Sequence, residues 1–152
     1  TMPSQILLGV RILIVEDVAA TRRLIARLLG SLGCHDLIEA DGIETAWQHL
    51  SRQHIDVMLL DYELLDGTGI KLMQELRANS ASPNHSVPTI MLTGHSEAGV
   101  VEESIRAGAD GFLVKPVMPD KLGRRILEVL ASRRSDIVRA AGRGPKTEVR
   151  WS

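Results

Sequence analysis

Residues 57–69, "VMLLDYELLDGTG", hold the most informative pattern in the chain, because an apolar run leads directly into a polar turn. Four apolar residues precede Asp61, and a second aspartate, Asp66, stands before Gly67 five residues later. An uninterrupted apolar run of this length is typical of a parallel strand that is covered on both faces. Asp61 is therefore predicted to stand at the carboxyl end of a central, buried strand.

On both sides of this strand, segments with strand pattern alternate with segments of helical periodicity. Strands are predicted at 11–16, 36–40, 55–61, 87–93 and 111–114, and helices at 19–33, 43–50 (after an Asp41-Gly42 cap), 68–79, 96–107 and around 122–130. Short strands joined by helices form right-handed parallel crossovers. The sequence thus predicts an α/β fold with a five-stranded parallel sheet, doubly wound by helices on both faces.

The pattern divides the chain into three parts. We expect an N-terminal lead at residues 1–9, one folded domain at 10–132 and a flexible basic tail at 133–152. From Arg133 onward the apolar periodicity fails, and six Lys or Arg stand against two Asp or Glu. Two other interpretations of the tail stay open: a docking arm for an anionic partner, or the start of a linker to an output domain.

Composition argues against several classes of protein. The 152 residues are 44% hydrophobic and 24% charged, with a net formal charge of −1, which is typical of a soluble globular domain. The one cysteine, Cys34, cannot form an internal disulfide, which favours a cytoplasmic setting. The longest apolar stretch is too short to cross a membrane, and no signal-peptide pattern is present. Few aromatic residues and an acidic body make nucleic acid an unfavoured partner.

Chemistry-bearing residues stand at the carboxyl ends of the predicted strands, where open α/β sheets bind ligands. These residues are Glu16, Asp17, Asp61, Thr93 and Lys115. Three clustered carboxylates repel one another, and a hard divalent cation such as Mg²⁺ relieves that repulsion. Because Lys115 adds a cation and Thr93 a donor, the set predicts a phosphoryl-binding site with Asp61 as the nucleophile.

Four motifs occur in a fixed order: "ILIVED" (12–17), "LLD" (59–61), "MLTG" (91–94) and "FLVKP" (112–116). With them the chain resembles the response-regulator receiver domains of two-component signalling, over residues 10–131. The segments "EDVAATRRLIARLLGSLG" and "IEADGIETAW" are similar to the stand-alone chemotaxis type. The resemblance implies a flavodoxin-like (βα)5 fold and a phosphoacceptor signalling protein rather than an enzyme.

The resemblance also implies a metal site. Asp61 matches the phosphoacceptor, Asp17 a direct ligand of Mg²⁺, and Glu16 a ligand that acts through water. The main-chain carbonyl of Glu63 matches the remaining protein ligand, and the turn after Asp61 is expected to face it toward the metal. Mn²⁺ is an alternative ion.

Three further residues match the family's switching apparatus. Thr93 matches the switch hydroxyl, Lys115 the phosphoryl-binding lysine and Phe112 the aromatic switch, and the Lys115-Pro116 bond is expected to be cis. The implied phosphodonor is a histidine kinase or a histidine-phosphotransfer protein. The implied downstream protein binds the face made by the fourth helix, the fifth strand and the fifth helix.

The chain departs from the family after Asp61, where "DYELLDG" is two residues shorter than usual and lacks a proline. A phosphorylation-independent binding module stays open as an alternative. So does an aspartate-nucleophile phosphatase of the haloacid-dehalogenase type, which uses an acid where Glu63 stands, although the chain lacks the cap domain and first-strand nucleophile of that class. Arg22, near Val18 and Ala19, is interpreted either as part of a donor-docking surface or as a solvated side chain.

Overall fold

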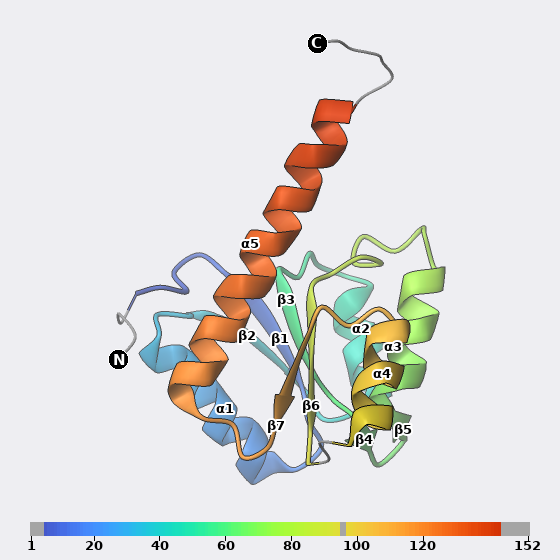
Figure 1. Cartoon of the computed structure of the whole chain (residues 1–152). Coiled ribbons are helices and arrows are strands. Elements are labelled where there is room, and N and C mark those ends of the chain that lie inside the picture. Colours follow the sequence, from blue (N-terminus) through green and yellow to red (C-terminus); the bar gives the residue numbers. More distant parts are fainter. Residues whose placement is uncertain (1–4, 95–96, 144–152) are drawn as a thin grey trace.

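A computed structural model describes residues 5–94 and 97–143 of the chain. Its main sheet has five parallel strands in the order β2-β1-β3-β6-β7 (Figure 1). Their bounds are β1 Arg11–Val15, β2 Asp36–Ala40, β3 Val57–Asp61, β6 Thr89–Thr93 and β7 Gly111–Val114. The chain runs from β1 to one side and then returns to the other side at β3. This reversal puts the usual ligand-binding crevice of an open sheet beside the end of β3.

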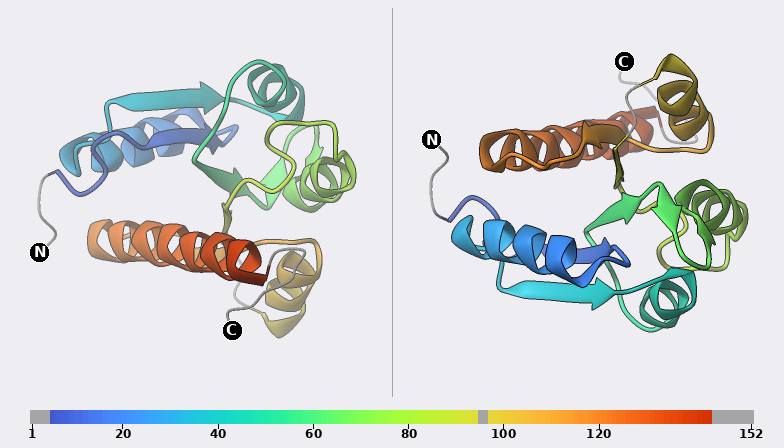
Figure 2. Two further views of the ribbon diagram at one scale, coloured as in Figure 1. Left: turned by 90° about the horizontal axis from the view of Figure 1, so that it is seen from above. Right: turned by 90° about the horizontal axis from the view of Figure 1, so that it is seen from below.

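Helices cover both faces of the sheet (Figure 2). α1 Ala19–Ser31 and α5 Pro119–Arg143 lie on one face, and α2 Ile43–Leu50, α3 Gly69–Ala78 and α4 Ala98–Arg106 lie on the other. Each face has its own apolar core: side chains of α1 and α5 pack in one, and side chains of α2 and α3 in the other. The predicted doubly wound arrangement is confirmed.

Alternate residues of the central strands supply the two cores, as the pleat of a strand requires. In β1, Ile12 and Ile14 point toward α1 and α5, whereas Leu13 and Val15 point toward α2 and α3. All five residues of β3 are buried, which agrees with the uninterrupted apolar run in the sequence. The rigid, two-sided packing of β3 fixes the position of Asp61 at its end.

The element order was predicted correctly, and apart from α5 the ends of the predicted elements lie within two residues of the observed ones. One element was missed. A short antiparallel hairpin of β4 Glu63–Leu64 and β5 Gly67–Thr68 directly follows β3. The turn that the sequence marked as unusually short is therefore regular structure rather than an open loop.

The predicted domain limits need correction at both ends. α5 continues to Arg143, so residues 133–143 form helix rather than a flexible tail, whereas residues 144–152 lie outside the described residues. No glycine or proline interrupts residues 124–141, so local helix propensity carries the helix beyond the sheet, where apolar periodicity ends (Figure 1). At the other end, Leu7 is fully buried and donates from its N–H to the carbonyl of Leu32, so the packed unit begins before residue 10.

No helix in the described part of the chain is both long enough and apolar enough to cross a bilayer.

Candidate functional site

Three carboxylates meet at the carboxyl edge of the sheet, the edge at which the parallel strands end. One oxygen each from Glu16, Asp17 and Asp61 lies within 4.8 Å of the other two. Glu16 is fully buried and Asp61 nearly so, whereas Asp17 is half-buried and open to water. Hard oxygen ligands with access for retained waters suit Mg²⁺ or Mn²⁺, so these residues fit a divalent cation.

Lys115 joins two of these acids. Its Nζ donates to Glu16 Oε1 at 2.6 Å and to Asp61 Oδ2 at 3.0 Å. Burial favours the neutral amine and lowers the pKa of Lys115, but the hydrogen bonds and charges of Glu16 and Asp61 outweigh burial, so the pKa is raised. Lys115 is therefore a fixed positive charge at the carboxylate that was predicted to be the nucleophile.

Both oxygens of Glu16 are engaged. Oε1 accepts from Lys115, and Oε2 accepts from the main-chain N–H of Val18 at 3.1 Å. By contrast, no described residue donates a hydrogen bond to Asp17 or forms an ion pair with it. The two neighbouring acids therefore differ: Glu16 is held by protein groups, and Asp17 keeps its oxygens for other ligands.

Thr93 and Phe112 lie on the two strands beyond β3. Thr93 ends β6, is 1% exposed, and accepts from the N–H of Lys115 at its main-chain carbonyl at 2.7 Å. Phe112 pairs with Met91 in register and is partly buried against the core on the α2 and α3 face. The Lys115-Pro116 peptide is cis, as expected.

The β4–β5 hairpin presents the Glu63 main chain to the acid site. Gly69 N donates to the Tyr62 carbonyl at 2.8 Å, so Tyr62 and Gly69 form a hydrogen-bonded pair of the antiparallel ladder. The next pair, Glu63 and Thr68, is therefore a non-hydrogen-bonded pair, in which the main-chain N–H and C=O of Glu63 point away from β5. The N–H of Glu63 points to Asp61 Oδ1 at 3.4 Å, and the N–H and C=O of one strand residue lie on the same side of the strand. This direction is compatible with the predicted role of the Glu63 carbonyl.

The hairpin lies against β3 at one end and is hydrogen-bonded to α2 at its tip. A Cβ at Gly69 would lie 2.3 Å from the Asp61 carbonyl oxygen, so only glycine fits there. At the tip, the Asp66 carboxylate accepts from the N–H groups of Ile43 and Glu44 at the start of α2. These bonds lower the pKa of Asp66, chiefly the bond from Ile43. The hairpin is thus tied to both β3 and α2.

Sequence reasoning missed two polar contacts near the site. The Tyr62 hydroxyl donates to Glu103 Oε1 on α4 at 2.6 Å, and this bond raises the pKa of Tyr62. Arg22 was predicted to face solvent or a docking partner, but it donates to the Glu16 carbonyl and to Glu39. Neither contact carries a sequence signal, because each joins residues from separate elements.

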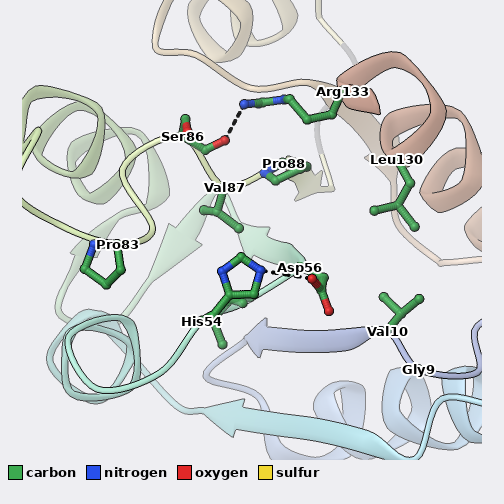
Figure 3. Close-up of a pocket in the computed structure, with 11 residues that line it drawn as sticks. Gly9, Val10, His54, Asp56, Pro83, Ser86, Val87, Pro88, Leu130 and Arg133 are labelled. Carbon is green, nitrogen blue, oxygen red and sulfur yellow. Dashed lines mark hydrogen bonds and ion pairs between the residues drawn. The ribbon is translucent and has the colours of Figure 1, made fainter. Parts of the chain in front are cut away.

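A cavity of 530 Å³ lies at the opposite, amino edge of the sheet, where the strands begin (Figure 3). Its lining is mainly apolar, and its polar groups point at each other. His54 Nε2 lies 3.1 Å from Asp56 Oδ1, and Arg133 donates to the Ser86 carbonyl. The three clustered carboxylates and Lys115 lie at the other edge of the sheet, away from this cavity.

The geometry therefore defines a parallel α/β sheet that carries an acid cluster and a lysine beside its central strand. Comparison with known proteins agrees: the chain belongs to the response regulator receiver domain family, which matches residues 12–127. These domains are signalling modules of two-component systems.

Particular relatives include the chemotaxis protein CheY of Pseudomonas aeruginosa, which is 32% identical over 119 residues; the match covers 78% of this chain and 94% of that protein. The phosphate regulon transcriptional regulatory protein PhoB of Escherichia coli is 32% identical over 120 residues, but this match covers only 51% of PhoB. The relatives thus include proteins of about this length and a much longer regulator.

Solved structures are similar over most of the chain. A CheY-like receiver domain protein from Methanospirillum hungatei gives a TM-score of 0.74 with 26% identity, over 84% of this chain and 98% of that one. Vibrio cholerae CheY4 gives a TM-score of 0.73 with 26% identity, over 80% and 98%. The flavodoxin-like receiver fold is confirmed.

Proposed function

We propose that this chain is a phosphoacceptor in a two-component phosphorelay. Asp61 takes a phosphoryl group from a phosphohistidine on a histidine kinase or a histidine-phosphotransfer protein. The observation that supports this most directly is the Lys115 ammonium, 3.0 Å from Asp61 and 2.6 Å from Glu16, within a cluster of three carboxylates. A nucleophile held beside a fixed cation suits transfer of a phosphoryl group.

The transfer uses this cluster together with the Thr93 hydroxyl. An oxygen of Asp61 attacks phosphorus, an O–P bond forms, and the P–N bond to the donor imidazole breaks. The imidazole nitrogen keeps the bonding electron pair and takes a proton from solvent. Lys115 and the Thr93 hydroxyl bind the phosphoryl oxygens, while the packing of β3 holds Asp61 in line.

Glu16, Asp17, Asp61 and the carbonyl of Glu63 would hold Mg²⁺, or Mn²⁺ in its place. When bound, the ion neutralises negative charge on the transferred group. Asp17 is the best direct ligand because no described residue engages it. Glu16 would contribute through water, since its oxygens already accept from Lys115 and Val18.

The acyl phosphate draws Thr93 inward, Phe112 turns toward the space that Thr93 leaves, and the face of α4, β7 and α5 changes shape. This face binds the downstream protein. It has exposed apolar side chains, with Ile105 61%, Val114 42% and Met118 54% exposed, and a cavity of 410 Å³ that Phe112 helps to line. A switch residue that lines a surface cavity can alter what that cavity binds.

The test is intact mass after incubation with phosphoramidate, with and without Mg²⁺. We expect a Mg²⁺-dependent, base-labile gain of one phosphoryl group in the wild type and in Asp41→Asn. Asp41 is a matched control because it follows β2 at the same edge but lies outside the acid cluster. No gain is expected in Asp61→Asn.

Equal gain in Asp61→Asn would show that another residue is the acceptor. No gain in the wild type, together with unchanged binding of a partner by Asp61→Asn, would favour the phosphorylation-independent binding module. Continuous release of inorganic phosphate from phosphomonoesters would favour the aspartate-nucleophile phosphatase.

A further inference from the structure

Arg22, in the first turn of α1, lies against the acid pair rather than in solvent. Its Nη1 donates to the main-chain carbonyl of Glu16 at 2.7 Å, and its Nε donates to Glu39 Oε1 at 3.0 Å. The Arg22 side chain is only 17% exposed. The planar guanidinium is therefore held in one orientation between the end of β1 and the end of β2.

The carbonyl that Arg22 binds belongs to the planar peptide unit between Glu16 and Asp17. The N–H of Glu16 is also fixed, because it donates to the Ala40 carbonyl at 3.0 Å. Both main-chain groups of Glu16 thus have partners, and the direction in which the chain continues to Asp17 is set. This constraint matters because no described side chain orients the Asp17 carboxylate.

A guanidinium beside a cation site would by itself weaken cation binding, because like charges repel. Glu39 offsets this effect by pairing with Arg22 on the side away from Glu16. Arg22 can therefore hold the main chain at the acid pair without adding an uncompensated positive charge.

We propose that Arg22 is a positioning residue for the divalent-cation site, and that Glu39 holds Arg22 in place. Arg22 fixes the Glu16–Asp17 peptide so that the Asp17 carboxylate converges with those of Glu16 and Asp61. The inference rests on the proposed function, since it takes this cluster to bind Mg²⁺ or Mn²⁺.

The test measures Mn²⁺ binding directly, by electron paramagnetic resonance titration of the 152-residue chain. We expect Arg22→Ala to weaken Mn²⁺ binding about 10-fold, the lower end for loss of a contact that orients a metal ligand. Arg22→Lys is expected to recover part of this loss, because an ammonium can reach one of the two acceptors but lacks the guanidinium fork.

Two matched variants separate positioning from general stability. Arg23→Ala removes the neighbouring, exposed arginine of the same helix. Arg11→Ala removes a similar ion pair between β1 and β2, with Asp36 at 2.9 Å, but at the amino edge. Both variants are expected to bind Mn²⁺ as the wild type does, even if Arg11→Ala lowers stability.

A kinetic measurement with phosphoramidate gives a second readout. In Arg22→Ala the Mg²⁺ concentration for half-maximal phosphorylation should rise about 10-fold, while the rate at saturating Mg²⁺ stays close to that of the wild type. Wild-type Mn²⁺ affinity in Arg22→Ala, or equal weakening in Arg11→Ala, would overturn the inference.

The outcomes also separate this inference from the proposed function. If the wild type binds Mn²⁺ with Arg22-dependent affinity but gains no phosphoryl group, the positioning role stands and the proposed function fails. If phosphorylation occurs but Arg22→Ala leaves Mn²⁺ binding unchanged, the proposed function stands and the positioning role of Arg22 fails. A wild type that binds no Mn²⁺ contradicts both.

Discussion

The two edges of the sheet differ in how their charged side chains are paired. At the carboxyl edge, three carboxylates lie together, the Lys115 ammonium binds those of Glu16 and Asp61, and Asp17 has no hydrogen-bond partner in the described part of the chain. At the amino edge, Arg77 and Arg133 both bind Asp110, and main-chain carbonyls take up their remaining donors. The carboxyl edge thus holds an acid that no described residue binds, whereas at the amino edge every charged group of this network has a partner of opposite charge.

The amino-edge network joins four parts of the chain. Arg77 on α3 donates to the carbonyls of His85, Val87 and Gly108 at 2.8–2.9 Å. Asp110, just before β7, also accepts from the N–H of Thr89 at 2.9 Å. Because the guanidinium satisfies carbonyls that would otherwise be half-buried without a donor, this edge contributes stability rather than chemistry.

Under the proposed function, the carboxyl edge is where a loss of stability is accepted so that a cation and a phosphoryl group can bind. Unpaired like charges lower stability and are kept where a ligand relieves them. Substitutions that remove a charge should therefore act with opposite sign at the two edges.

The largest expected effect comes from breaking the amino edge. Arg77→Ala should lower the free energy of unfolding by about 3 kcal/mol, because it leaves a partly buried carboxylate and several carbonyls without a donor. Urea denaturation followed by circular dichroism measures this change. Arg106→Ala, an exposed arginine in the last turn of α4, is the matched control and should change stability by less than about 0.5 kcal/mol. Similar losses in both variants would contradict the structural role of the network.

A smaller effect of opposite sign is expected at the carboxyl edge. In a chelator and at low salt, Asp17→Asn should raise the free energy of unfolding by about 0.5–1 kcal/mol, since two charges about 4 Å apart repel by about 1 kcal/mol in water. In excess Mg²⁺ the wild type should instead be more stable than Asp17→Asn, because Mg²⁺ stabilises the protein that binds it more tightly. Asp110→Asn should instead be destabilising with and without Mg²⁺. An Asp17→Asn variant that is less stable than the wild type in chelator would remove the contrast between the edges.

The sequence was sufficient for the parts of this picture that depend on local pattern. The apolar run before Asp61, and the polar residues after the other strands, predicted the sheet and the residues that meet at its carboxyl edge. Glu16, Asp17, Asp61 and Lys115 do come together. Parallel strands bring their ends to one edge whatever the loops do, so this meeting needs no knowledge of side-chain packing.

The missed features depend on contacts between distant residues. The sequence shows the two-residue shortening after Asp61. It does not show that the Asp66 carboxylate, at the tip of the hairpin, accepts a hydrogen bond from Ile43 at the start of α2. Asn84 lies in a polar segment typical of an open loop, yet it is buried and bonds the main chain of Leu50 and Ile55. Arg133 marked the loss of apolar periodicity, but its bonds to Asp110 and Ser86 anchor the continuing helix. In each case the partner is more than twenty residues away in sequence.

The smallest expected effect concerns Tyr62, which connects the carboxyl edge to α4. It is the only tyrosine, so phenolate absorbance reports its ionisation alone. The hydrogen bond to Glu103 raises the pKa of Tyr62 above the usual value of 10.0. Because this folded-state pKa is raised, the stabilisation from the pair is complete below pH 10 and is lost as pH rises through the folded pKa.

Glu103→Gln keeps an acceptor but removes the negative charge, so the pKa of Tyr62 should fall toward its usual value. Glu102→Gln, an exposed neighbour on the same helix, should leave the titration unchanged. A spectrophotometric titration of the folded protein measures the pKa of Tyr62 in both variants, and circular dichroism verifies folding at each pH. If the wild type and Glu103→Gln titrate together, Tyr62 is not held by α4 in solution. If they differ as expected, the residue next to Asp61 is physically tied to the helix that the proposed switch would move.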